Sequence, residues 1–118
     1  MTPDEINRLR HMRDGANAAL TFAAGRTLDD VGKDLMLQFA LIRALEIVGE
    51  AASKIGVATR SSHPEIPWLV IVGMRNRLIH GYYDVDMEIL WKTVNASLGP
   101  LVVALEAILH PLGDEPKP

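Results

Sequence analysis

The sequence predicts an all-α protein, an antiparallel four-helix bundle, on three observations. Apolar residues recur every three or four positions through most of the 118 residues, which is the spacing of one helix face. Residues that favour helix starts and helix ends divide these stretches into four segments. No segment shows a convincing alternation of apolar and polar residues, which is the pattern of a half-buried strand.

The first helix is predicted from its start signal. Thr2 can cap it, Pro3 suits the first helical position, and Glu5 stands three residues after the cap, which completes a capping box. Gly25 ends the helix because glycine adopts the backbone conformation that follows a helix end. Thr27 is the cap of a second helix, expected to continue without a break to about residue 55.

The second helix carries apolar residues on two nearly opposite sides. One set is Leu35, Phe39, Ile42, Leu45, Gly49 and Ala52, and the other is Leu37, Leu41, Ala44, Val48, Ala51 and Ile55. A surface helix needs one apolar stripe, so a second stripe needs a second partner. An identical chain is the commonest such partner, and small residues permit close helix approach. We therefore expect a homodimer with this helix near its interface, at Gly49, Ala51 and Ala52.

The third and fourth helices are predicted from proline, glycine and apolar spacing. Residues 61–64 read as a loop, and Pro67 suits the start of a helix over 68–80 that Gly81 ends. The fourth helix covers about 86–110, with a kink expected at Gly99-Pro100 because proline removes a backbone hydrogen bond.

Length and composition favour a single helical domain over residues 1–113 with a flexible tail at 114–118. The absence of cysteine excludes disulfides, thiolate zinc sites and cysteine nucleophiles. We find no secretory signal and no apolar run near 20 residues that lacks an interrupting charge, so we expect a cytoplasmic protein without membrane contact. The net charge of −3 argues against a general nucleic-acid coat, but a nuclease needs only a local basic site.

Residues 74–83 concentrate the groups that can do chemistry. Arg75 can hold a phosphate through two hydrogen bonds, and His80 can move protons near neutral pH. Together they suffice for RNA cleavage without a metal. The structural alternative is a good helix end, since basic residues followed by glycine belong there. Spacing alone favours that alternative, because an arginine and a histidine separated by four residues occur widely by accident.

Longer stretches make the comparison more specific. Residues 42–52, 64–68, 73–82, 85–86 and 89–94, in this order and spacing, resemble the HepT-like branch of the HEPN ribonuclease superfamily. The resemblance covers about residues 40–95.

The resemblance implies an all-helical toxin that cuts RNA through an R-x4-H motif, with Arg75 and His80 as its catalytic residues and Asn76 beside them. It also implies a homodimer in which two motifs face a shared cleft. The HepT-like branch extends the motif to R-x4-H-x-Y, which places a tyrosine at Tyr82. An MntA-type nucleotidyltransferase antitoxin would transfer AMP to this tyrosine. Tyr83 is expected only to pack at the helix end.

Arg77 and Glu50 are predicted to support the site. Glu46 and Glu50 could instead be neutralised by Arg43 and Lys54 one turn away, or could orient Arg75. Acidic residues near His80 are better explained as a helix start than as ligands, so we expect no metal.

Phosphate-binding glycine loops are absent, so we expect no cofactor and assign ATP to the antitoxin. The main rival hypothesis is a non-catalytic HEPN module that assists a partner nucleotidyltransferase. A purely structural helical dimer, whose motif is only a helix end, is the third possibility.

Overall fold

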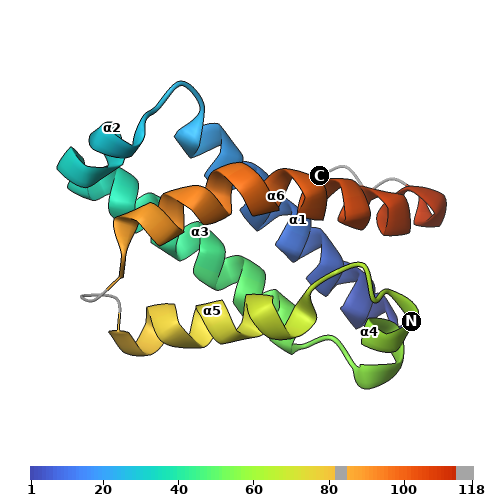
Figure 1. The fold of residues 1–118 in the computed structure, drawn as a ribbon. Coiled ribbons are helices and arrows are strands. Elements are labelled where there is room, and N and C mark those ends of the chain that lie inside the picture. The colour runs from blue at the N-terminus through green and yellow to red at the C-terminus, as the bar shows by residue number, and fades with distance from the viewer. Residues whose placement is uncertain (82–84, 114–118) are drawn as a thin grey trace.

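The structure is a computed structural model that describes residues 1–81 and 85–113. Its helices are α1 (Pro3–Ala23), α2 (Leu28–Lys33), α3 (Leu35–Ser53), α4 (Val57–Ser62), α5 (Trp68–Gly81) and α6 (Met87–Leu109), followed by the 3₁₀ turn η2 (His110–Leu112) (Figure 1). The described residues contain no strand. The predicted all-α class is confirmed, and α1, α3, α5 and α6 are the four long helices expected. The predicted tail at 114–118 lies outside the described residues.

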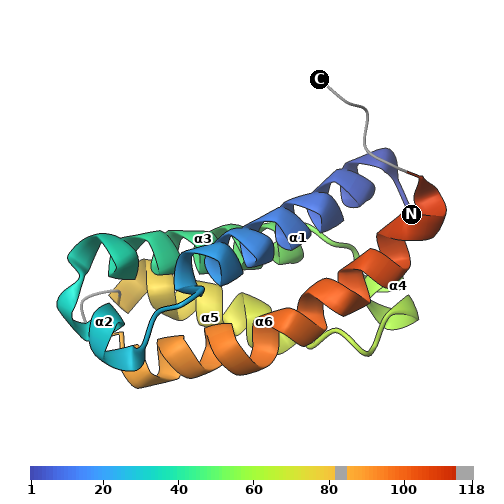
Figure 2. The same cartoon turned by 90° about the horizontal axis from the view of Figure 1, so that it is seen from above.

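The bundle is built around α3. This helix packs against α1 on one side and against α5 on the other, while α6 covers a further face of α1 (Figures 1 and 2). Most of both apolar sets of α3 is buried, and the chain's own α1 and α5 cover the two sides. The second partner that the pattern demanded is therefore supplied by the same chain.

This packing corrects the predicted dimer interface. Gly49, Ala51 and Ala52 lie buried within the chain, so they cannot form a close contact with a second copy. Leu35 and Phe39, from the first turns of the same helix, are exposed instead. The homodimer itself stays a prediction.

Both predicted caps, Thr2 and Thr27, are present, and each forms a capping box. The Thr2 hydroxyl accepts from the Glu5 N–H at 3.1 Å, and Thr27 and Asp30 form the equivalent pair at the start of α2. The expectation of one unbroken second helix is wrong, because Asp34 adopts an extended conformation (φ −112°, ψ 101°). Its carboxylate accepts from the Leu37 N–H at 3.1 Å, so Asp34 caps a new helix.

The short helix α4 occupies part of the predicted loop. Its N-cap, Gly56, has no side chain to accept a hydrogen bond. The Glu5 carboxylate of α1 accepts from the Gly56 N–H at 2.7 Å and from the Thr59 hydroxyl at 3.1 Å. A residue 51 positions away thus holds the start of α4, which local sequence patterns cannot reveal.

We expect Glu5→Gln to destabilise the fold near neutral pH. The hydrogen bonds from the Gly56 and Thr2 backbone N–H groups lower the pKa of Glu5 from its usual 4.5. A lowered pKa means that the ionised form stabilises the folded state above about pH 4.5, and this contribution disappears as the pH falls through the lowered value. Urea midpoints of the wild type and the variant should therefore differ at pH 7 and converge near pH 3. A constant difference, or none at pH 7, would contradict this role; Glu65→Gln, at an exposed carboxylate, is the control.

Helix α6 is long and apolar enough to cross a membrane by length and composition alone. Its apolar sequence is nevertheless interrupted by the charges of Glu88, Lys92 and Glu106. A core helix can have the same composition, and one face of α6 lies in the core. The buried residues of this face are Leu90, Val94, Leu98, Leu101, Leu105, Ile108 and Leu109. The helix continues through Pro100, and the kink expected there stays a prediction.

Candidate active site

Helix α5 carries the motif and is anchored at its beginning. The Trp68 side chain is buried, and its indole N–H donates to the His63 carbonyl at 3.0 Å. Ile66, just before the helix, is also buried. These contacts hold the first turn of α5, and the helix then crosses α3 (Figure 1). Trp68 is therefore a core residue.

Arg75 lies directly on Gly49 of α3. A Cβ atom added at Gly49 would overlap the Cβ of Arg75 and lie 2.8 Å from its Cγ. It would also lie 3.2 Å from the Ile71 carbonyl oxygen. The absent side chain at Gly49 therefore allows α5 to approach α3 at the position of the arginine. The sequence pattern predicted that Gly49 permits close approach of a helix from a second chain, whereas the helix that approaches is α5 of the same chain.

The guanidinium group of Arg75 keeps donors available. Its Nη1 donates to the Asn76 side-chain oxygen at 3.0 Å. Its Nε is buried and has no hydrogen-bond partner within the part of the chain that the structure describes. A buried donor without a partner costs roughly 1–3 kcal/mol of stability. An arginine whose stem is fixed and whose cationic head is partly exposed is suited to bind a phosphate.

The structure describes some of the remaining motif residues and not others. Asn76 and Arg77 are exposed on α5. Position 80 continues the helical backbone of α5, but the His80 side chain lies outside the described residues, and so does Tyr82. The structure therefore brings Arg75 and Asn76 together, and it leaves the distance from Arg75 to the histidine and tyrosine groups undescribed.

Glu50 lies toward α1. It lines a depression of about 200 Å³ together with Arg8 and His11 of α1 and with Ile47 and Ala51 of its own helix. Glu46 is the partner of Arg43, at 3.9 Å between Nη1 and Oε2. Among the described side chains, Arg75 forms no ion pair with either glutamate. The alternative in which Arg43 neutralises Glu46 is confirmed.

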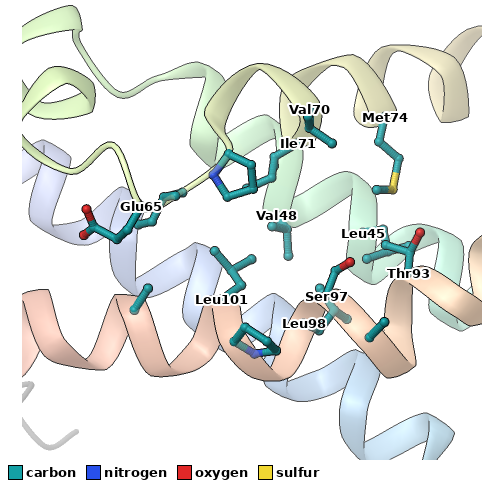
Figure 3. A pocket seen from close by; sticks show the side chains of 15 residues that line it. Leu45, Val48, Glu65, Val70, Ile71, Met74, Thr93, Ser97, Leu98 and Leu101 are labelled. Carbon is teal, nitrogen blue, oxygen red and sulfur yellow. The ribbon is translucent and has the colours of Figure 1, made fainter.

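Two cavities lie on the other side of α5, between this helix and α6. The larger has a volume of about 360 Å³ and is mainly apolar, with Val70, Ile71 and Met74 contributed by α5 (Figure 3). The smaller, of about 270 Å³, lies further toward the C-terminal end of α5 and includes Arg77 and Asp86. Arg75 lines neither cavity. Within residues 1–81 and 85–113, no three His, Asp or Glu side chains gather as metal ligands would.

Comparison with known proteins assigns the family. A family model described as ribonuclease HepT-like matches residues 6–108. A protein of Thermococcus cleftensis named "Probable ribonuclease HepT" is 50% identical over 68 residues, which cover 58% of this chain and 62% of that protein. No solved structure matches the chain.

Two further relatives match over more of the chain, and both are named as candidate RNases. The relative from Caldanaerobacter subterraneus is 34% identical over 86% of this chain and 91% of its own length. The relative from Methanocaldococcus jannaschii is 35% identical over 80% of this chain and 87% of its own length. The chain therefore belongs to the ribonuclease HepT-like family.

Proposed function

We propose that this chain is an endoribonuclease, the RNA-cutting toxin of a bacterial toxin–antitoxin system, with Arg75 and His80 as its catalytic residues. The observation that carries the assignment to this site is the packing of Arg75 on Gly49, with its Nε left without a hydrogen-bond partner among the described residues. The family match and the names of the relatives support the reaction class.

The proposed reaction needs no metal. The ribose 2′-oxygen attacks phosphorus while the bond from phosphorus to the 5′-oxygen breaks, which leaves a 2′,3′-cyclic phosphate and a free 5′-hydroxyl. His80 either takes the proton from the 2′-hydroxyl or gives one to the 5′-oxygen. Arg75 stabilises the negative charge on the phosphate oxygens as they become crowded. Asn76 orients the Arg75 head, and the exposed Arg77 adds positive charge for the RNA backbone.

The spacing of positions 75 and 80 along α5 favours a homodimer in which two motifs face each other. Five residues along an α-helix correspond to a rise of about 7.5 Å and a rotation of about 140°. Positions 75 and 80 of α5 therefore lie on different faces of the same helix. A cleft formed between two chains can combine an arginine face with a histidine face, so we propose that the active unit is a dimer.

We further propose that an MntA-type nucleotidyltransferase antitoxin silences the toxin at Tyr82. The tyrosine oxygen would attack the α-phosphorus of ATP, which forms tyrosyl-AMP and releases pyrophosphate. Each AMP adds a negative phosphodiester and a bulky base two residues from His80. The added charge repels RNA, in the manner of other charge-adding modifications.

The test is growth of cells that express each variant with and without the neighbouring nucleotidyltransferase gene. The wild type should be toxic alone and harmless with the antitoxin. Arg75→Ala and His80→Ala should be harmless in both backgrounds. Tyr82→Phe should stay toxic even with the antitoxin, because the acceptor oxygen is gone, while Tyr83→Phe should still be rescued.

Two outcomes would contradict the proposal. If every version is harmless although folded and dimeric, the chain is a non-catalytic module that assists a nucleotidyltransferase. If His80→Ala is as toxic as the wild type, the motif is only a helix end. Arg43→Ala, at an exposed arginine of α3, is the matched control for loss of positive charge.

A further inference from the structure

The outward face of α6 is apolar and uncovered. Only 33% of the apolar window of this helix is buried. Ile89 and Val103 are both mostly exposed, at 62% and 71%. Ala96, Pro100 and Ala107 lie exposed on the same side. A contiguous apolar face that is this exposed is expected to be covered in the working protein.

The uncovered area continues onto α5. Leu69 and Val70, in the first turn of α5, are exposed. Between them and α6 lies the 360 Å³ cavity, whose lining includes Ser97 (Figure 3). The small residues Ala96 and Ala104 of α6 also line it. The exposed face of α6 and the cavity therefore form one apolar surface, which we call the α6 surface.

The α6 surface has the spacing of a helix-pairing seam. Ile89, Ala96 and Val103 recur at intervals of seven residues, and Pro100 and Ala107 are also seven apart. Seven-residue spacing keeps the same side of a helix turned toward a partner helix. Because the residues near the middle of α6 are small, a partner helix can approach closely there.

Two residues of opposite charge beside this row of apolar residues are placed symmetrically about Gly99. Lys92 and Glu106 lie at equal distances along the chain from Gly99, and both are exposed. In an antiparallel pair of α6 helices that cross at Gly99, Lys92 of one chain lies beside Glu106 of the other. Glu106 also lies 3.6 Å from Arg13 of its own chain, yet its side chain remains half exposed.

We propose that the α6 surface binds a second copy of this chain, with the two α6 helices antiparallel about a two-fold axis near Gly99. The self-complementary charges favour an identical chain over an unrelated helix or a lipid surface. Because α6 has 23 residues, about 35 Å long, this pairing sets the two motif-bearing ends far apart. It leaves the α3–α5 face with Arg75 free, so it is additional to a dimer that brings two motifs together.

The first test compares two exposed valines. Val103→Glu introduces a charge into the α6 surface and should weaken self-association at least about 100-fold, because the carboxylate would be buried without a partner. Val57→Glu, at a valine of α4 that is 80% exposed, should have no effect. Native mass spectrometry and light scattering should show that Val103→Glu at least halves the number of copies in the assembly.

Charge reversal provides the second test. Lys92→Glu should weaken association about five-fold at low salt, and Lys92→Glu with Glu106→Lys should restore it. Lys33→Glu, at an exposed lysine of α2, is the control.

An assembly whose size is unchanged by Val103→Glu would overturn the proposal. A wild type that is monomeric at all concentrations would also overturn it, and would leave another protein or a lipid surface as the occupant. RNA cleavage measured on the same samples reports on the active site separately, so failure of this surface is distinguishable from failure of the proposed function.

Discussion

Arg75→Ala should slow RNA cleavage by at least about 100-fold, the usual loss when one group that stabilises transition-state charge is removed. The aliphatic part of the Arg75 side chain packs against Gly49 of α3. A neighbouring cation therefore does not take the place of the guanidinium group when Arg75 is removed. Arg75→Lys should recover only part of the rate, because an ammonium group keeps the charge but lacks the two parallel donors of a guanidinium.

Single-turnover cleavage of a fluorescent RNA measures this effect, with circular dichroism to confirm the fold. Arg43→Ala removes an exposed arginine from α3 and should stay within about two-fold of the wild type in cleavage, since its partner is Glu46 of the same helix. Retention of wild-type cleavage by folded Arg75→Ala would remove this residue from the proposed chemistry.

The second large effect is expected for Gly49→Ala. Replacing glycine by alanine inside a helix ordinarily stabilises a protein by about 0.5–1 kcal/mol. Here the new Cβ overlaps Arg75, and the close neighbours include the Ile71 backbone, so α5 must shift. Overpacking of this kind costs about 1–3 kcal/mol, which outweighs the helix preference and makes the net effect destabilising. Cleavage should fall further than the loss of folded protein explains, because Arg75 is displaced.

Gly73→Ala is the matched control for this prediction. Gly73 lies on α5 two residues before Arg75, and an added Cβ there meets nothing within 4 Å. It should raise the urea midpoint, whereas Gly49→Ala should lower it. If both variants are stabilised equally, Arg75 is not held against α3 in the way described here.

Features that depend on neighbouring residues were predictable from the sequence. The caps at Thr2 and Thr27 need only residues three positions apart, and both are present. The buried sides of α3 were predictable from helical spacing. The break at Asp34 was missed because aspartate can cap a helix as well as continue one at modest cost.

Features that depend on packing between helices were not predictable in the same way. The contact between Gly49 and Arg75 joins two helices, and the hydrogen bond from Gly56 to Glu5 spans 51 residues. Sequence spacing identified Gly49 as a point of close approach but could not tell whether the approaching helix belonged to the same chain. The family motif supplied Arg75 and His80, and the structure adds how the arginine is supported.

RNA cleavage by the purified protein in the presence of EDTA tests the central claim most directly. We predict that the wild type cuts RNA and leaves 2′,3′-cyclic phosphate and 5′-hydroxyl ends. We predict that His80→Ala is at least about 100-fold slower, since general acid–base catalysis contributes 10²–10⁴-fold. A folded wild type that leaves RNA intact, or a His80→Ala variant that cuts at the wild-type rate, would contradict the account.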